Sequence, residues 1–519
     1  MSADWQTSSQ TLIGNTGFHG SRLGSGRETT TIVLLIVMAC VLAGVLLITN
    51  GNLMAAAIPL VGIAILFLSF YRLDWGFNVL LGAILLFDQY SQHASQPLTL
   101  AVHYFQNLKE NPYLPSADAA VVSPFELHLL LVVFVWLVYF IIHKQGGFRT
   151  IPLWQIVLLL FAWLAFSFSY GMIKGGNLLP GLWESRALVY LGVFYFLVPQ
   201  IVKTRQHLRS IVWVCIAVVS FKAFQGIVYF VSSGFSFWNE SYMTASQEDS
   251  LFIVLLMMLL MTFTFLGGES KQKYTLLLLF LPLLLGFFSG NRRATYVSFA
   301  ISTIALAVLL PRKQQKQMLL VVISLVVVFG IYLGVFWNNG GLLGWPAQQV
   351  KSILFEDKTL MTSRNYSSNY YREVEKYNIE FTIRDSPVTG IGFGVPYATP
   401  INLFLKFGLS EYITHNSLLW LFMKTGAIGF FLFMVFLNTF LFRGASVFSR
   451  LNDPYLKVLV ALCLIAVINQ MVVTYVEMHF TYYRNMSFLG ILMGLIPVIE
   501  SINTEESQAS LKKTASPKT

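Results

Sequence analysis

The chain repeats long apolar runs, and no other feature restricts its fold as strongly. A run of ~20 apolar residues spans the hydrocarbon core of a bilayer as an α-helix, because a helix satisfies its own backbone hydrogen bonds there. About fourteen such runs occur, at 31–49, 53–71, 74–88, 122–142, 151–170, 187–201, 210–232, 250–267, 274–288, 294–310, 318–337, 425–442, 455–476 and 485–499. Four of them, at 74–88, 187–201, 274–288 and 485–499, are shorter than a perpendicular span requires. With 56% hydrophobic and only 11% charged residues, the sequence predicts an all-α polytopic integral membrane protein with about 12–14 transmembrane helices.

The distribution of lysine and arginine orients these helices. Most of these residues outside the longest loop fall in the connections on one side, which the positive-inside rule makes cytoplasmic. Both termini are then cytoplasmic, and the net charge of +10 reflects this bias, so it gives nucleic-acid binding no support. The chain divides into a cytoplasmic tail, membrane helices, a long loop on the outer face, further membrane helices and a second cytoplasmic tail, at 1–30, 31–337, 338–412, 413–499 and 500–519.

Four arginines fall at the outer ends of helices, where topology does not require them. They are Arg186, Arg292, Arg293 and Arg484. The planar guanidinium suits phosphate oxygens, so arginines on one face suggest a phosphate or diphosphate ligand at headgroup depth. Each single arginine could instead reach lipid headgroups or pair with a neighbouring carboxylate. The adjacent pair Arg292 and Arg293 favours the anion, because two neighbouring cations repel each other unless an anion lies beside them.

The outer loop at 338–412 is too long for a simple connection, and its many aromatic residues argue against disorder. Residues 366–383 predict a short amphipathic helix. Gly390, Gly392 and Gly394 lack the third glycine at dinucleotide spacing, so nucleotide binding is not expected. They could bring backbone N–H groups close to an anion or a sugar, or they could form a bare turn.

A histidine ends this polar region just before the next apolar run. Imidazole can gain and lose a proton near neutral pH, so His415 can accept a proton, which is the task of a general base. Its neighbour Asn416 could orient it. The alternative is a histidine that anchors the loop or bonds at a helix start. Cys40, Cys215 and Cys463 lie within apolar runs without metal-ligand spacing, so packing roles, no metal and no cofactor are expected.

These motifs resemble those of a known family. The run from Arg384 to Gly394, R-D-S-P-V-T-G-I-G-F-G, is followed by H-N-S-L-L from His415 and K-T-G-A-I-G from Lys424. This pattern resembles the O-antigen ligase superfamily of bacterial envelope glycan transferases over roughly 180–445, and Arg293-Ala294 resembles its "SRG/A" motif. Arg292 stands where that family usually has serine, so either arginine of the pair could contact the diphosphate. The family's usual dozen helices are fewer than the fourteen runs found here.

The resemblance implies a function as well as a fold. It implies a bacterial inner-membrane enzyme, without metal or nucleotide, whose periplasmic site transfers an undecaprenyl-diphosphate-linked glycan to a glycan or lipid A–core acceptor with inversion. His415 would be the base, and Arg186, Arg292 and Arg293 would hold the lipid diphosphate. Arg384, Asn416 and Arg484 are secondary candidates. Because both substrates are amphipathic, a lateral opening to the membrane lipids is expected.

Two other functions compete with a ligase. An O-antigen or exopolysaccharide polymerase of the same superfamily would differ only in its acceptor. A polysaccharide transporter or flippase would need charges along a path through the membrane. Lys222 is the clear charge within an apolar run, and no internal repeat is evident, so the sequence favours a transferase.

Overall fold

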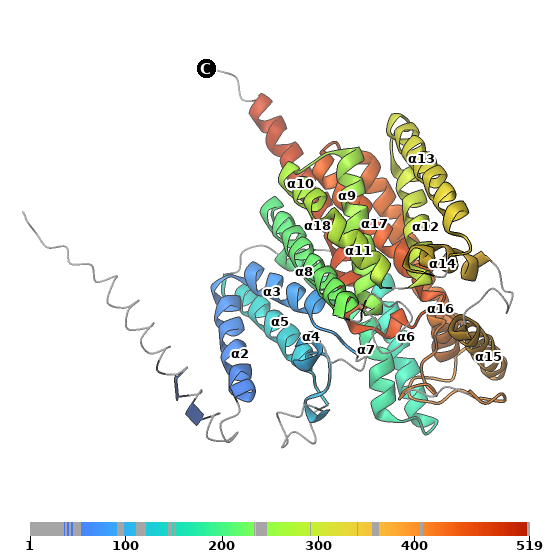
Figure 1. Ribbon diagram of the computed structural model, residues 1–519. Coiled ribbons are helices and arrows are strands. Elements are labelled where there is room, and N and C mark those ends of the chain that lie inside the picture. Colours follow the sequence, from blue (N-terminus) through green and yellow to red (C-terminus); the bar gives the residue numbers. More distant parts are fainter. Residues whose placement is uncertain are drawn as a thin grey trace, which may run out of the picture.

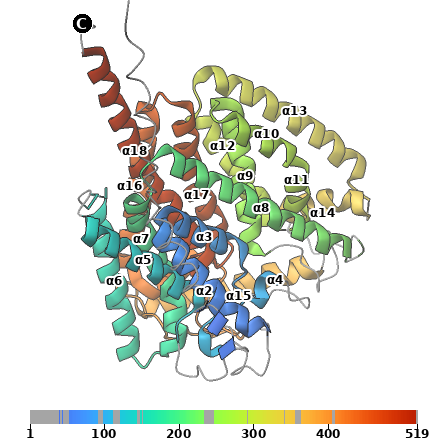
Figure 2. The same cartoon turned by 90° about the vertical axis from the view of Figure 1, so that its left-hand side faces the viewer.

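A computed structural model describes most of the chain. The described stretches are 53–90, 98–110, 121–143, 148–149, 151–232, 246–290, 292–339, 341–354, 363–403 and 408–515, with a few isolated residues elsewhere. Within them the regular elements are all helices, arranged side by side as a bundle (Figures 1 and 2). The all-α prediction is therefore confirmed.

The first half of the chain forms most of the bundle. Its elements are α2 (Leu53–Tyr71), α3 (Leu73–Leu86), α4 (Leu98–Ala101), η1 (Leu108–Glu110), α5 (Pro124–His143), α6 (Trp154–Ile173), α7 (Leu178–Ile201), α8 (Arg205–Ser232) and α9 (Gln247–Leu266). The expected run at 31–49 lies almost entirely outside the described residues, as does the predicted tail at 1–30.

The second half adds the helices of the outer loop and the last spans. Its elements are α10 (Ser270–Leu278), α11 (Phe280–Ser289), α12 (Arg293–Leu309), α13 (Arg312–Phe336), η2 (Leu342–Gly344), α14 (Trp345–Leu354), α15 (Ser363–Asp385), α16 (Ser417–Arg450), α17 (Pro454–Thr474), η3 (His479–Thr481) and α18 (Tyr483–Ala515).

Every predicted apolar run within the described part of the chain forms a helix. Nine helices there are long and apolar enough to cross a membrane. The run at 274–288 forms α10 and α11, which meet at an angle of 53° and would make a tenth span. The apolar helices 60–71, α3 and α12 are shorter. The described residues thus contain a helix for each predicted span except the first.

Consecutive spans alternate in direction, which gives the bundle two distinct ends. At one end Arg205, between α7 and α8, forms ion pairs with Asp453 (2.8 Å) and Glu506 (2.5 Å). His415 lies at the other end, where α15 is found (Figure 1). We call these the Arg205 end and the His415 end. The predicted cytoplasmic connections fall at the Arg205 end, while the side of the membrane that each end faces stays a prediction.

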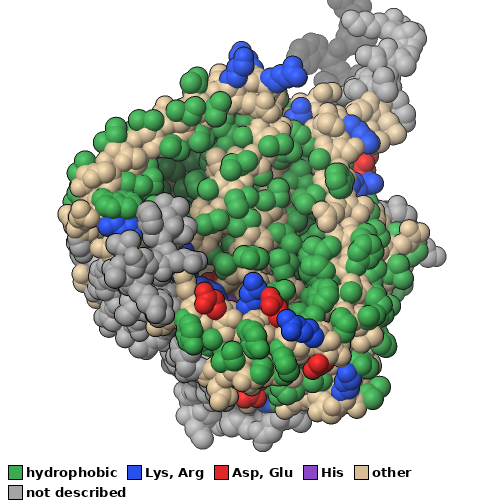
Figure 3. Space-filling model, turned by 90° about the vertical axis from the view of Figure 1, so that its right-hand side faces the viewer, with side chains coloured by type: hydrophobic (Ala, Val, Ile, Leu, Met, Phe, Trp, Pro, Cys, Tyr) green, Lys and Arg blue, Asp and Glu red, His purple; other side chains and the backbone are tan. Residues whose placement is uncertain are grey.

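α7, α17 and α18 form the buried centre of the bundle, whereas α13 stands apart. The most apolar stretches of α17 and α18 are 78% and 83% buried, but that of α13 is 0% buried. On the side of α12 to α15 the surface is hollowed and lined by apolar side chains, with charged side chains gathered at one end of the hollow (Figure 3). An apolar surface of this kind suits contact with lipid.

Two predicted boundaries differ from the structure. The amphipathic helix expected at 366–383 is present as the longer α15. α18 continues to Ala515, so most of the segment at 500–519, which was expected to be a tail, extends the last span as a helix. The helix continues because this segment begins with polar residues that a helix accepts, such as Asn503. Its glutamates also hold it in place, since Glu505 pairs with Arg149 and Glu506 pairs with Arg205 at the Arg205 end.

Candidate functional site

His415 lies where the polar loop meets α16, and it is partly accessible. Its side chain is 20% exposed. The next residue, Asn416, is the N-cap of α16, and its side chain accepts the backbone N–H of Leu419 at 3.0 Å. This bond satisfies one of the donors that a helix start leaves unpaired. Asn416 therefore fixes the helix start, and the expected role in orienting the histidine ring falls to another residue.

That residue is Glu375 of α15. Its Oε1 lies 3.2 Å from Nδ1 of His415, and its Oε2 accepts the backbone N–H of His415 at 2.9 Å. Glu375 is 1% exposed, so its carboxylate is held away from water. The ring of Tyr371, one turn earlier on α15, meets the His415 ring edge-on at 5.3 Å. One carboxylate thus holds both the backbone and the ring of His415, which fixes the ring's position and directs Nε2 away from Glu375.

A second buried carboxylate lies near the histidine. Glu477 follows α17, and its Oε1 pairs with Nη2 of Arg372 at 3.2 Å. Burial works to raise the pKa of Glu477, but Arg372, Arg292 and the nearby histidines together hold that pKa below its usual range. Glu477 is therefore a carboxylate at neutral pH. The hydroxyl of Ser417 donates to its backbone carbonyl at 2.8 Å, which joins this connection to the start of α16.

The arginine pair reaches the same place from α12. Arg292 is the N-cap residue of α12, and its charge acts on Glu477 and His479. Arg293, the first residue of α12, donates from Nη2 to Asn369 of α15 at 2.8 Å. His415 and Arg293 each contact α15, and the charge of Arg292 acts on Glu477, which pairs with Arg372 of the same helix. We call Arg292, Arg372, Glu375, His415 and Glu477 the histidine cluster.

Arg186 lies in a different set of contacts. Its Nη1 donates to Asn107 at 2.9 Å, its Nη2 donates to the carbonyl of Val121, and its Nε lies 3.3 Å from Glu126. The hydroxyl of Tyr190 also donates to Glu126, at 2.7 Å. These contacts tie α7 to the start of α5. The structure therefore pairs Arg186 with a carboxylate, the alternative that the sequence left open, and its contact with a diphosphate stays a prediction.

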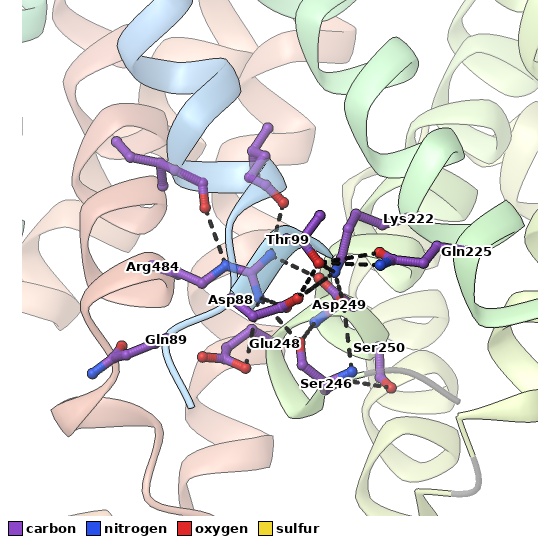
Figure 4. A network of polar contacts seen from close by, with 12 residues as sticks. Asp88, Gln89, Thr99, Lys222, Gln225, Ser246, Glu248, Asp249, Ser250 and Arg484 are labelled. Atoms are coloured by element: carbon purple, nitrogen blue, oxygen red, sulfur yellow. Dashed lines mark hydrogen bonds and ion pairs between the residues drawn. The ribbon is translucent and has the colours of Figure 1, made fainter. Parts of the chain in front are cut away.

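Arg484 belongs to a buried network of five charges (Figure 4). Its Nη1 lies 3.1 Å from Asp88 and its Nη2 lies 2.7 Å from Asp249. Lys222 pairs with the same two aspartates, at 2.9 and 3.1 Å. Glu248 lies 3.8 Å from Arg484. We call Asp88, Lys222, Glu248, Asp249 and Arg484 the arginine network.

The remaining contacts of Arg484 show what the arginine network does. Its guanidinium also donates to the carbonyls of Ile84 and Leu85 and to the hydroxyl of Ser246. Through Arg484 and Lys222 the network joins α3, α8, α9 and α18, and its charged side chains are at most 5% exposed. Arg484 thus holds helices together within a protein interior. Arg384, in contrast, lies exposed at the end of α15.

The glycine-rich segment is a packed turn. Gly390, Gly392 and Gly394 have φ angles of +74°, +89° and +78°, which side chains other than glycine rarely adopt. A Cβ on Gly392 would lie 2.5 Å from the backbone of Gly171, so α6 and the turn approach each other closely. The N–H groups of residues 390–394 are all used inside the protein, by Ser386, Met423, Lys424, Ser167 and Glu184. They therefore do not form a cradle for an anion.

A buried ion pair fastens this turn to the bundle. Glu184 of α7 and Lys424 of α16 are both 0% exposed, and their side chains lie 2.8 Å apart. Glu184 accepts the N–H of Gly394 at 2.6 Å, while Lys424 donates to the carbonyl of Val395. The kink of α16 at Gly426, with φ +67°, lets the turn pair with the helix backbone there. The K-T-G motif thus supports the loop that ends in His415.

Sequence reasoning missed the carboxylates of the site. Glu375 lies on the amphipathic helix that the sequence did predict, and a glutamate facing its apolar side would have been the available signal. Glu477 lies seven residues before Arg484 in the sequence, and nothing in the local pattern singles it out. Among the described residues, no group of three or more His, Cys, Asp or Glu side chains is arranged to hold a metal ion.

Fold and site together define an all-α polytopic membrane protein with a histidine–carboxylate pair and arginines at one end of its bundle. Residues 277–434 match the family model described as O-Antigen ligase, which supports the predicted resemblance to the O-antigen ligase superfamily. The match begins in α10, ends in α16 and includes Arg292, Arg293, Glu375, the glycine turn and His415. Arg186 lies outside it. No curated protein matches the chain. The family indicates a protein of ligase-like or polymerase-like function on glycans.

Proposed function

We propose that this protein is a bacterial inner-membrane glycan transferase of the O-antigen ligase type. It moves an undecaprenyl-diphosphate-linked glycan to an acceptor hydroxyl at the periplasmic face, with inversion at the transferred sugar. The observation that carries the proposal is the His415–Glu375 pair, held at 3.2 Å and accompanied by Arg292, Arg293 and Arg372. A base and a group of guanidinium ions are what this reaction requires.

The pair suits proton abstraction from a hydroxyl. Because Glu375 accepts from Nδ1–H, the lone pair of His415 lies on Nε2. The acceptor oxygen attacks the anomeric carbon and forms the new glycosidic bond, and its proton passes to Nε2. The buried carboxylate stabilises the imidazolium that results.

The arginines suit the leaving group. As the bond between the anomeric carbon and the diphosphate oxygen breaks, its electron pair goes to the diphosphate. Guanidinium ions stabilise that developing negative charge through paired N–H donors. Arg293 is anchored by Asn369 and Arg372 by Glu477, so both are positioned before a substrate arrives. The apolar hollow beside α12 to α15 suits the lipid part of the donor and supports the lateral opening that the sequence predicted (Figure 3).

The structure offers less support for transport. A transporter needs charged groups distributed along a path. Lys222, the charge that raised this possibility, pairs with Asp88 and Asp249 in the arginine network. Its charge is thereby neutralised within a closed set of partners.

Deletion of the protein followed by complementation tests the proposal. His415→Ala should reduce transfer by ~10²–10⁴-fold, the range for removal of a general base, while the protein remains folded and inserted. Glycan gels of the cell envelope would measure transfer, and trypsin resistance in membranes would report the fold. Near-normal glycan attachment in this variant would overturn the assignment of the base.

The deletion strain also separates the two members of the superfamily. Loss of a ligase leaves long lipid-linked chains unattached, whereas loss of a polymerase leaves glycans of a single repeat. Unchanged glycans in the deletion strain would contradict both.

A further inference from the structure

Two polar side chains, one in the histidine cluster and one beside it, make no contact with a substrate in the reaction described above. Glu477 and His479 lie in the short connection between α17 and α18, at the His415 end. Glu477 is 6% exposed and His479 is 1% exposed. They are close enough that the charge of each shifts the pKa of the other. Such deeply buried polar groups normally have hydrogen-bond partners.

His479 is a neutral hydrogen-bond donor. Nδ2 of Asn485 donates to its Nδ1 at 2.5 Å, which places the ring proton on Nε2. Burial lowers the pKa of His479 to about 4, so the ring stays uncharged at neutral pH. Nε2 has no hydrogen-bond partner among the residues that the structure describes.

Glu477 supplies the complementary acceptor. Its Oε1 is used by Arg372, but its Oε2 is buried without a hydrogen-bond partner in the described part of the chain. A buried donor and a buried acceptor are thus both unsatisfied within three residues of each other, next to His415 and Arg292. A group that accepts one hydrogen bond and donates another can satisfy both.

A second buried histidine also has a ring nitrogen without a hydrogen-bond partner among the described residues. His128 of α5 is 6% exposed, its Nδ1 lies 2.9 Å from the Tyr104 hydroxyl, and its Nε2 also has no partner among the described residues. Its ring meets the ring of Tyr104 edge-on at 6.4 Å, and Tyr104 in turn packs against Phe125. A single unsatisfied nitrogen is therefore compatible with packing, whereas a neighbouring unsatisfied donor and acceptor can both be satisfied by one hydroxyl group.

We propose that Glu477 and His479 bind one sugar hydroxyl of the glycan substrate and so position the sugar for His415. The hydroxyl donates to Oε2 of Glu477 and accepts from Nε2–H of His479, and no covalent bond changes. This inference rests on the proposed glycan transfer. The hydroxyl belongs either to the donor glycan or to the acceptor, because both present the same chemistry.

Binding measurements on the full-length protein in lipid nanodiscs test the inference. Three probes would be used: undecaprenyl diphosphate, the lipid-linked glycan purified from cells that lack this protein, and lipid A–core from the same cells. In His479→Ala the Kd of one glycan-bearing probe should rise about tenfold, the effect of losing a hydrogen bond and leaving a buried carboxylate unpaired. The Kd of undecaprenyl diphosphate should stay unchanged. The probe that loses affinity identifies the source of the hydroxyl.

Matched variants separate binding from folding. Glu477→Gln keeps the shape of the side chain and should weaken the same probe, which keeps the test informative if His479→Ala does not fold. His479→Gln retains an N–H donor and should recover part of the affinity. His128→Ala removes an equally buried histidine and should leave all three Kd values unchanged.

The two possible failures have different results. Unchanged Kd values for both glycan probes in His479→Ala and Glu477→Gln would mean that the pair holds only water, and the inference would be overturned. If the wild-type protein bound neither glycan probe, the proposed function would fail as well.

Discussion

The histidine cluster and the arginine network are two groups of charged side chains that differ in how far their basic side chains are exposed. In the arginine network, Arg484 donates to three side chains and two backbone carbonyls, and its side chain is 0% exposed. In the histidine cluster, the side chains of His415 and Arg372 remain 20% and 28% exposed. Glu477 of the histidine cluster and Glu248 of the arginine network each keep one buried oxygen without a hydrogen-bond partner in the described residues, so the exposure of the basic side chains is what distinguishes the two groups.

We infer from this difference that the arginine network has a structural role and that the histidine cluster takes part in the reaction. A buried charge with all its donors used cannot bind a substrate without breaking bonds that hold helices together. A charge that is fixed on one side and open on the other can bind a substrate with little rearrangement. Substitutions in the arginine network should therefore affect folding, whereas substitutions in the histidine cluster should affect transfer.

The largest effect is expected from Arg484→Met. This change leaves Asp88 and Asp249 buried with one cation fewer, and removing one partner of a buried ion pair costs ~3–5 kcal/mol. The variant should accumulate poorly, measured as folded protein by size-exclusion chromatography in detergent. Accumulation equal to the wild type, combined with lost transfer, would mean that Arg484 takes part in the reaction, and would contradict the structural role of the arginine network.

Glu375→Gln should come next and should act on transfer alone. Glutamine keeps the size of the side chain but removes the charge that stabilises the imidazolium of His415, so transfer should fall by roughly 10²-fold. The midpoint of thermal unfolding should change little. An unchanged rate of transfer would show that the ring of His415 is not oriented by this carboxylate.

Arg293→Ala should have a smaller effect, confined to the donor. Loss of a charged hydrogen bond of about 1.5–3 kcal/mol predicts that KM for the lipid-linked donor rises about 10- to 100-fold. Arg293→Lys keeps the charge but not the planar fork, and its KM should lie between those of Arg293→Ala and the wild type. If all three KM values agree, the diphosphate must be held elsewhere, and Arg186 becomes the next residue to test.

The pH dependence of stability should report the titration of His479. The pKa of His479 is lowered to about 4 in the folded protein from the ordinary ~6.5, so the unfolded chain binds a proton at a pH where the folded chain does not. The stability of the folded state should therefore fall as pH decreases from about 6.5 to 4, by up to ~3 kcal/mol. His479→Gln should flatten this part of the curve of unfolding temperature against pH. An identical slope in the two proteins would show that His479 is already protonated when folded.

Much of the fold could be predicted from the sequence, because a local run of apolar residues specifies each transmembrane helix. The apolar runs within the described residues are helices, and α15 appeared where the pattern placed an amphipathic helix. Helix ends were less predictable. α7 begins at Leu178 although its apolar run begins at 187, because Asn177 caps the helix and polar residues such as Glu184 are buried against other helices.

The residues of the candidate site also differ in whether they could be predicted from the sequence. The sequence alone selected His415, Arg292 and Arg293, because a base and adjacent cations on the outer side of a membrane protein are unusual in themselves. It could not select Glu375 or Glu477, since these carboxylates act through contacts 40 and 105 residues away along the chain, with His415 and Arg372. It also grouped Arg484 with the other outer arginines. Only the packing of α3, α8, α9 and α18 around Arg484 decided that its charge is used within the protein, because charge pairing depends on which helices are neighbours.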